Sequence, residues 1–312
     1  MATKQITNAS AKVSVTEFAR ALDLEVVYSG RGEIDLETIS VTRPGLPLAG
    51  YFKFFDHKRV QVVGNAEYEF LQSLKKETAT ENLDKLFSKQ IPCLIFSRKL
   101  PVFDFVIKLA EKYGCPILSS YKVTTVLIND ITIYQNELLA PTKVVHGVLL
   151  DVFGVGMLIV GKSGIGKSEV ALELVHRGHR LVSDDSVIVK NINEQLIGKA
   201  PEKIKYYMEI RGIGIINLQQ MFGPGAIRPE KSIDIIVELS PWAEGNTYDR
   251  IGNEESYEEL LGIEKPKIAI PVTPGRNVPI IIETAARKYR LKQAGYDAAA
   301  ELVASVFGED KQ

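Results

Sequence analysis

The sequence predicts a mixed α/β protein that is divided into two domains. The chain has 312 residues, and at about 150 residues per domain this length fits two domains better than one. Strand-like and helical runs alternate along the N-terminal part of the chain. Near the middle, an apolar run, a glycine-rich turn and a helical run follow one another, which is typical of an α/β unit.

The composition excludes several classes of protein. The 38 Lys and Arg residues balance 39 Asp and Glu residues, which argues against a nucleic-acid partner. Hydrophobic residues make up 45% of the chain, enough to bury a full core. The longest nearly apolar stretch, residues 148–161, is shorter than the roughly 20 residues that cross a bilayer, so we expect no membrane segment. Cys93 and Cys115 form no metal-ligand spacing and no disulfide framework, which favours the reducing cytoplasm.

The N-terminal part is predicted to be a small α/β domain. Ser14 and Glu17 match a capping box, so a helix is expected to begin there. His57 lies in a polar surface loop, and we assign it no function. Strand-like and helical runs then alternate at residues 60–63, 67–74, 81–87, 93–96, 103–112 and 117–118.

The junction between the domains is expected after a further helix over residues 124–139. Ala140 precedes Pro141, and a residue before proline avoids the helical conformation. We expect an N-terminal α/β domain over residues 1–132 and a C-terminal domain over residues 133–312.

A glycine-rich segment in the C-terminal half matches the P-loop pattern G-x-x-x-x-G-K-[ST]. A strand-like run at 157–160 precedes it and a helical run at 168–177 follows it, as a phosphate-binding loop requires. We expect Lys167 to reach the β and γ phosphates of a nucleotide and the Ser168 hydroxyl to bind Mg²⁺. The absence of an Asn-Lys-x-Asp segment downstream favours ATP over GTP. The segment consists of Gly161, Lys162, Ser163, Gly164, Ile165, Gly166, Lys167 and Ser168.

Two adjacent carboxylates follow the next strand-like run. Asp184 and Asp185 end the run 180–183, and we expect the carboxyl end of this strand to lie at the same sheet edge as the glycine-rich segment. One carboxylate would bind Mg²⁺ and the other would accept a proton from an attacking hydroxyl. The residues alone do not decide which carboxylate has which role.

His146 is a third candidate. A hairpin turn near residue 154 would pair the strand containing His146 with the strand that leads into the glycine-rich segment. In this register His146 would lie opposite residues 162–163, beside the phosphates. The alternative is a histidine that only fills the core.

The order of several motifs resembles the bifunctional HPr kinase/phosphorylase family, bacterial enzymes that phosphorylate a serine of the phosphocarrier protein HPr. The resemblance covers residues 144–147, 161–168, 181–185, 209–218 and 271–276, and it therefore extends over the C-terminal half. It implies a P-loop kinase domain similar to phosphoenolpyruvate carboxykinase. It also implies phosphorolysis, in which inorganic phosphate attacks phosphoserine and pyrophosphate is released, and a role in carbon catabolite repression.

The resemblance also implies roles for single residues. Lys167 and the loop would bind ATP, Ser168 and Glu209 would bind Mg²⁺, and Asp185 would accept the proton. His146 and Arg250 match the other catalytic positions of the family. Residues 209–218 are associated with both activities, and a further loop is associated mainly with dephosphorylation. This loop consists of Pro271, Val272, Thr273, Pro274, Gly275 and Arg276.

The family forms hexamers, so a homohexamer is expected. Residues 284–307 are predicted to form one long amphipathic helix, which would pack either within the chain or against another subunit or HPr. Two other functions stay open: a small-molecule kinase related to phosphoenolpyruvate carboxykinase, and an ATP-sensing regulator without catalytic activity.

Overall fold

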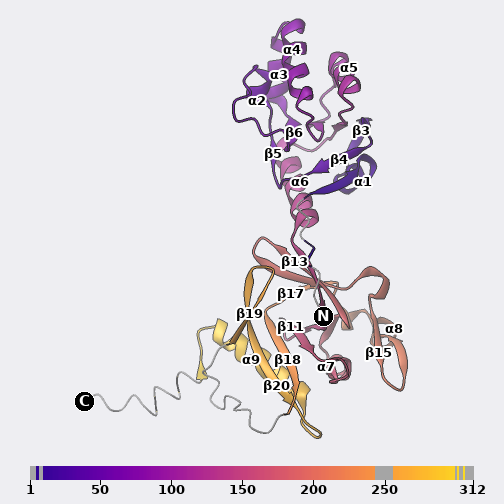
Figure 1. Cartoon of the computed structure of the whole chain (residues 1–312), viewed down its shortest axis with the longest axis vertical. Coiled ribbons are helices and arrows are strands. Elements are labelled where there is room, and N and C mark those ends of the chain that lie inside the picture. The colour runs from indigo at the N-terminus through magenta and orange to yellow at the C-terminus, as the bar shows by residue number, and fades with distance from the viewer. Residues whose placement is uncertain (1–4, 7–9, 243–255, 299–300, 302–304, 306–312) are drawn as a thin grey trace, which may run out of the picture. The chain divides into compact units, whose positions relative to one another are not determined.

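The computed structural model describes residues 5–6, 10–242, 256–298, 301 and 305, and the chain forms two compact units. One unit is Thr7–Ala140, and the other comprises Met1–Ile6 and Pro141–Gln312. Both contain sheets and helices (Figure 1), so the prediction of a mixed α/β protein in two parts is confirmed. The limits 1–132 and 133–312 for the functional domains stay a prediction.

The N-terminal unit is a five-stranded sheet with helices on both faces. Its order is β3-β8-β7-β6-β5, in which β8, β7, β6 and β5 are parallel. The strands are β3 (Glu25–Tyr28), β5 (Val41–Thr42), β6 (Val60–Val63), β7 (Leu94–Phe96) and β8 (Ile117–Ser119), beside a separate pair of β2 (Ala11–Ser14) and β4 (Glu33–Leu36). The helices are α1 (Val15–Leu22), α2 (Gly45–Leu48), α3 (Asn65–Ser73), α4 (Lys76–Ser88), α5 (Asp104–Tyr113) and α6 (Thr124–Leu139).

Local sequence signals account for these helices. The Ser14 hydroxyl accepts a hydrogen bond from the Glu17 backbone N–H, as the capping box predicts. Helix α5 ends at Gly114, whose positive φ of 65° suits glycine. Helix α6 spans the predicted residues, and the predicted strands β6, β7 and β8 are all present.

The C-terminal unit is built on a six-stranded mixed sheet with the order β12-β10-β11-β18-β20-β19. Strands β11, β18 and β20 are parallel. Strand β12 runs in the same direction, because β10 is antiparallel to both β11 and β12. The carboxyl ends of β11, β12, β18 and β20 therefore meet at one edge. The strands are β10 (Val148–Val152), β11 (Val155–Gly161), β12 (Arg180–Ser183), β18 (Ile235–Pro241), β19 (Ser256–Leu260) and β20 (Ile263–Val272).

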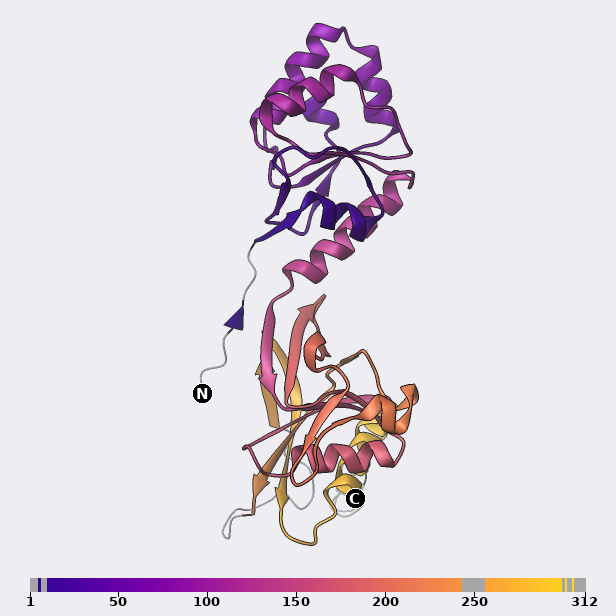
Figure 2. The same cartoon turned by 90° about the vertical axis from the view of Figure 1, so that its right-hand side faces the viewer.

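The two faces of this sheet are covered differently. One face packs on a second sheet through a cluster that includes Leu149, Val187 and Ile236. The other face packs on helices α7 (Lys167–His176) and α9 (Val278–Gln293) and on a β-hairpin (Figure 2). The second sheet contains β1 (Gln5–Ile6), β9 (Thr142–His146), β13 (Ser186–Ile192), β14 (Gln195–Lys199) and β17 (Glu230–Ser232), and the hairpin consists of β15 (Tyr207–Ile210) and β16 (Gly214–Asn217). Short helices η1 (Glu202–Ile204), α8 (Leu218–Phe222) and η2 (Pro224–Ala226) complete the unit.

The predicted helix over residues 284–307 is wrong in its limits. Helix α9 begins at Val278 and ends at Gln293. The Asn277 side chain caps its start by accepting a hydrogen bond from the Ile280 backbone N–H. Gly295, with φ 89°, turns the chain, and the Tyr296 backbone N–H bonds back to the Leu291 carbonyl. The glycine signal outweighs the apolar periodicity that suggested a longer helix.

Helices α7 and α9 are tied together at the end of α7. His179 is buried, and its Nε2 lies 2.8 Å from Glu283 Oε1 on α9. The His179 ring packs edge-on against Phe153 and faces this carboxylate. Within the described part of the chain, no helix combines the length and the apolar character that a membrane crossing requires.

Candidate active site

The glycine-rich segment forms a loop between β11 and α7, as predicted. Gly164 and Gly166 have positive φ values of 83° and 100°, which side-chain-bearing residues rarely adopt. Gly161 approaches the next strand so closely that a Cβ atom would lie 2.6 Å from the Leu239 carbonyl oxygen. Glycine is therefore required at these positions, and the loop leads directly into the N-terminus of α7, where backbone N–H groups and the helix dipole favour an anion.

Lys167 is the first residue of α7, and its side chain folds back over the loop. Its Nζ donates hydrogen bonds to the carbonyl oxygens of Gly161 and Lys162, at 3.0 and 3.2 Å. The residue is buried. The loop carbonyls thus hold the ammonium group at the mouth of the loop, where an incoming phosphate would compete for the same donor.

Ser168 and Asp184 meet beside this loop. The Ser168 hydroxyl donates to Asp184 Oδ1 at 3.0 Å, and its distance to Oδ2 is 3.2 Å. Burial raises the pKa of Asp184, whereas the Ser168 hydroxyl and the backbone N–H groups of Glu209 and Asp185 act in the opposite direction. Asp184 follows β12, so the expectation that this strand ends at the edge of the glycine-rich loop is confirmed.

Asp185 is placed quite differently from its neighbour. Its side chain is 71% exposed, and its Oδ1 lies 3.1 Å from His146 Nδ1. Its backbone has φ 64°, the left-handed region. The chain therefore turns sharply between the two carboxylates, so that one is fixed inside and the other faces solvent.

The predicted register of His146 is wrong, although His146 does reach this region. It belongs to β9, which pairs with β13 in the second sheet and sets His146 opposite Ser186. The hairpin of β10 and β11 begins only at Val148, which pairs with Ile159. Gly147 separates the two sheets: a Cβ there would lie 2.6 Å from the Ile159 carbonyl oxygen, and its N–H bonds to the Asp185 carbonyl. His146 thus approaches Asp185 through the second sheet.

The β15–β16 hairpin brings further groups to the loop. The backbone N–H of Glu209 bonds to the Asp184 carboxylate, while the Glu209 side chain lies on the exposed face of the strand. At the hairpin turn, the Arg211 guanidinium lies over Gly164, where a Cβ would be 3.0 Å from Nη2. The sequence reasoning did not single out Arg211; its signal is an arginine followed by two spaced glycines, Gly212 and Gly214, within the block 209–218.

The remaining expected site residues are Arg250 and the segment 271–276, and the structure describes only the segment. Arg250 lies outside the described residues. The segment 271–276 leaves the end of β20, at the same sheet edge as the glycine-rich loop, and Arg276 N–H closes a turn on the Thr273 carbonyl at 3.1 Å. A role for these residues in dephosphorylation stays a prediction.

The donor set fits a hard cation. Among the described residues, no three or more His, Cys, Asp or Glu side chains form a metal cluster. The Ser168 hydroxyl and the Asp184 carboxylate nevertheless meet at the start of α7, and oxygen donors of this kind suit Mg²⁺ when nucleotide phosphates complete its shell. Binding by Glu209 would require its exposed side chain to turn toward the loop.

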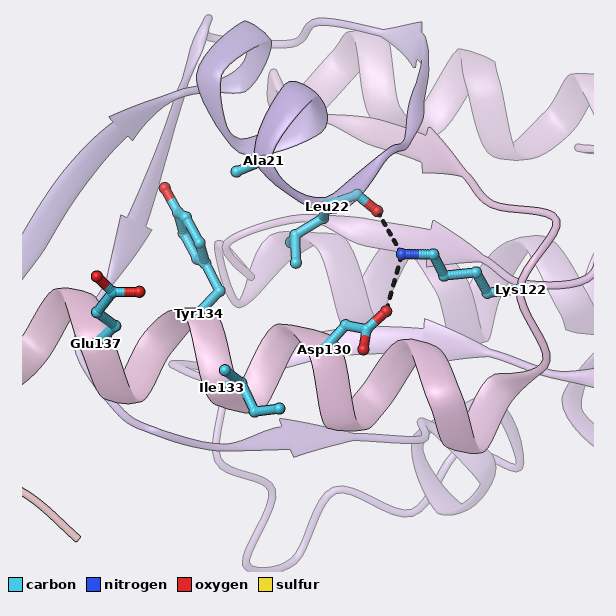
Figure 3. Close-up of a pocket in the computed structure, with 7 residues that line it drawn as sticks. All are labelled: Ala21, Leu22, Lys122, Asp130, Ile133, Tyr134 and Glu137. Atoms are coloured by element: carbon cyan, nitrogen blue, oxygen red, sulfur yellow. Dashed lines mark hydrogen bonds and ion pairs between the residues drawn. The ribbon is translucent and has the colours of Figure 1, made fainter. Parts of the chain in front are cut away.

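Two hollows are found in the described part of the chain, and none of the candidate site residues lines either of them. One, of about 240 Å³, lies between α1 and α6, where Lys122 donates to the Leu22 carbonyl and Asp130 (Figure 3). The other, of about 550 Å³, is lined by the β10–β11 turn and α9. The β10–β11 turn lies at the opposite end of β11 from the glycine-rich loop, and Asp185 is not among the residues that line either hollow.

The burial of Asp184 predicts that its charged carboxylate lowers the stability of the folded protein at neutral pH. A carboxyl group whose pKa is raised by folding destabilises the folded state once the pH exceeds its ordinary pKa of about 4. We therefore expect Asp184→Asn to raise the Tm at pH 7, by about 2–4 °C per kcal/mol relieved, and this gain to shrink as the pH falls toward 4. Thermal unfolding across this range measures it, with the exposed Asp23→Asn as control. A lower Tm at pH 7 would contradict it.

Comparisons with known proteins match both parts of the chain. The family model described as the HPr Serine kinase C-terminal domain matches residues 137–306, and the one described as the HPr Serine kinase N terminus matches residues 13–134. An HPr kinase/phosphorylase from Peptoclostridium acidaminophilum is 48% identical over 291 residues, covering 92% of this chain and 94% of the relative.

Two further proteins are similar to this chain. An HPr kinase/phosphorylase from Caldanaerobacter subterraneus subsp. tengcongensis is 46% identical, covering 93% of this chain and 96% of the relative. A solved structure of the Hpr(Ser) kinase/phosphatase from Coxiella burnetii is 39% identical, with a TM-score of 0.47, and covers 51% of this chain and 97% of its own.

Proposed function

This chain belongs to the HPr serine kinase family, and on that premise we propose that it phosphorylates a serine of HPr with ATP and removes the phosphoryl group by phosphorolysis. The observation that carries the proposal is the position of Asp185, which is exposed and paired with His146 beside the partly buried contact of Ser168 and Asp184. An exposed proton acceptor suits a folded protein substrate. A small-molecule kinase would instead enclose its acceptor in a pocket.

The glycine-rich loop acts as a P-loop for the nucleotide. Its N–H groups and the N-terminus of α7 bind the phosphates, and Lys167 exchanges its two loop carbonyls for phosphate oxygens. Arg211 at Gly164 adds a second positive charge at the loop. These charges stabilise the phosphoryl group during transfer, which is the main contribution a protein makes to this reaction.

Mg²⁺ would be held by Ser168 and Asp184, with Glu209 as a further ligand. When bound, it neutralises charge on the phosphate oxygens. The Ser168 hydroxyl donates to the Asp184 carboxylate, so these oxygen donors already lie together at the start of α7.

Asp185 handles the proton in both directions. In phosphorylation its carboxylate accepts the proton of the serine hydroxyl while the serine oxygen bonds to the γ phosphorus and ADP leaves. In the reverse step an oxygen of inorganic phosphate bonds to the phosphoserine phosphorus while the bond from this phosphorus to the serine oxygen breaks. The protonated Asp185 returns its proton to that serine oxygen, and pyrophosphate and free serine result. His146 orients Asp185 through the contact between their side chains. Arg250 acts as a further catalytic residue, and the segment 271–276 takes part mainly in dephosphorylation.

The wider setting of the protein is part of the same proposal. Membership in the family and the match of both of its domains support a homohexamer, a kinase domain related to phosphoenolpyruvate carboxykinase, and control of carbon catabolite repression. The two cysteines, both buried and without a disulfide, support a cytoplasmic location.

The proposal is tested by incubating the full-length protein with Mg-ATP and purified HPr, with and without inorganic phosphate. We expect phosphoserine on HPr in the first case, and loss of phosphoserine with release of pyrophosphate when phosphate is in excess. HPr with its acceptor serine replaced by alanine is the control. Transfer only to a metabolite would favour the small-molecule kinase, and ATP binding without transfer would favour the regulator.

A further inference from the structure

The β15–β16 hairpin has one buried face and one exposed apolar face. Met208 and Ile210 point into the core that contains α7. On the opposite side, Ile215 is 75% exposed, Ile213 at the turn is 73% exposed, and Tyr207 is also exposed. We call Tyr207, Ile213 and Ile215 the hairpin face.

The hairpin face exposes apolar side chains to water, which is unfavourable unless another surface packs on them. Exposed large apolar side chains that gather on one element often mark a site of interaction, whereas single scattered ones are ordinary. Isoleucine is β-branched and tyrosine is rigid, so both lose little side-chain freedom when a partner packs on them. The hairpin face therefore has the composition of a protein-binding surface.

Two contacts fix the hairpin face next to the candidate active site. The Glu209 backbone N–H bonds to the Asp184 carboxylate, and Ile215 stands directly opposite Glu209 in the ladder, about 5 Å away. At the turn, Arg211 lies over Gly164, and Ile213 is two residues further on. A partner on this face is thus held beside the loop and the adjacent Asp185.

We propose that the hairpin face is the docking surface for HPr, and that it receives apolar side chains flanking the acceptor serine. The inference rests on the proposed function and adds to it the surface that selects the substrate. The face adjoins the glycine-rich loop and the Asp184 carboxylate, where the acceptor serine must arrive, so the protein substrate is the occupant that the location favours.

The test is the double variant Ile213→Thr, Ile215→Thr in the full-length protein. Threonine keeps the β-branched shape and strand propensity of isoleucine but removes its apolar contact. We expect the KM for HPr and for phosphoseryl-HPr to rise at least about tenfold. The rise in the KM for HPr should exceed any change in kcat and in the KM for ATP, and this split separates lost docking from a damaged site.

A matched control uses the same substitutions at exposed isoleucines of the other unit, Ile39→Thr and Ile133→Thr, which should leave every constant unchanged. An unchanged KM for HPr in the hairpin variant, with the wild type active, overturns the docking proposal alone. A wild type without HPr phosphorylation overturns the proposed function instead. If light scattering shows that the hairpin variant loses its assembly state, the face is a contact between copies and the docking proposal fails.

Discussion

Asp185→Asn is expected to lower phosphoryl transfer to HPr by at least about a thousandfold while ATP affinity stays within about tenfold. Asparagine has the shape of aspartate but does not accept the serine proton. It also tolerates the left-handed backbone of φ 64° at this position, so the turn between the two carboxylates is kept. Single-turnover transfer of labelled phosphate to HPr and equilibrium binding of ATP measure the two quantities separately.

The chain offers a close control for this change. Asp23 is also exposed and also left-handed, with φ 56°, but it lies at the end of α1 in the other unit. Asp23→Asn should leave transfer unchanged. If Asp185→Asn keeps transfer within about tenfold of wild type, another group takes the proton, and the role proposed for Asp185 is wrong.

Lys167→Ala is the second large effect. Removal of the ammonium group leaves the loop without the side-chain charge that faces the β and γ phosphates, so we expect the rate of transfer to fall at least about a hundredfold and ATP affinity to fall with it. The rate should depend on Lys167 in both directions, since ATP and inorganic phosphate share the loop. Assays of phosphorylation and of phosphorolysis, each against a titration of its phosphate substrate, measure this.

Lys85→Ala on the exposed side of α4 is the matched control, because it removes the same group from a surface ion pair with Glu81. Lys167→Ala with both activities near wild type would show that the loop does not bind the phosphates. The Tm of the variant checks its fold independently. Lys167→Ala removes only two hydrogen bonds to loop carbonyls, so the Tm should stay close to that of the wild type.

Local signals in the sequence predicted local structure well. Ser14, Gly114, Pro141 and the glycines of residues 161–166 each fix the backbone within a few residues, and the corresponding elements are present where expected. The glycine-rich loop and its strand and helix were accessible for the same reason. The motif spacing alone therefore located the centre of the candidate site.

Long-range pairing was not accessible in the same way. His146 was assigned to the wrong neighbour because the pairing of β9 with β13 joins segments about forty residues apart, and no local pattern records it. Arg211 was missed because its position over Gly164 depends on how the hairpin packs against α7. The different environments of Asp184 and Asp185 likewise follow from one left-handed residue, which their composition does not reveal.

The exposure of Asp185 has a consequence for the hydrolysis of ATP by water. The Asp185 side chain is 71% exposed, so water reaches this carboxylate when no partner is present. An arriving protein that rests on the neighbouring hairpin would form the missing wall and expel that solvent. HPr would then be both the acceptor of the phosphoryl group and the group that excludes water from Asp185. ATP would therefore react when HPr is bound and stay intact when HPr is absent.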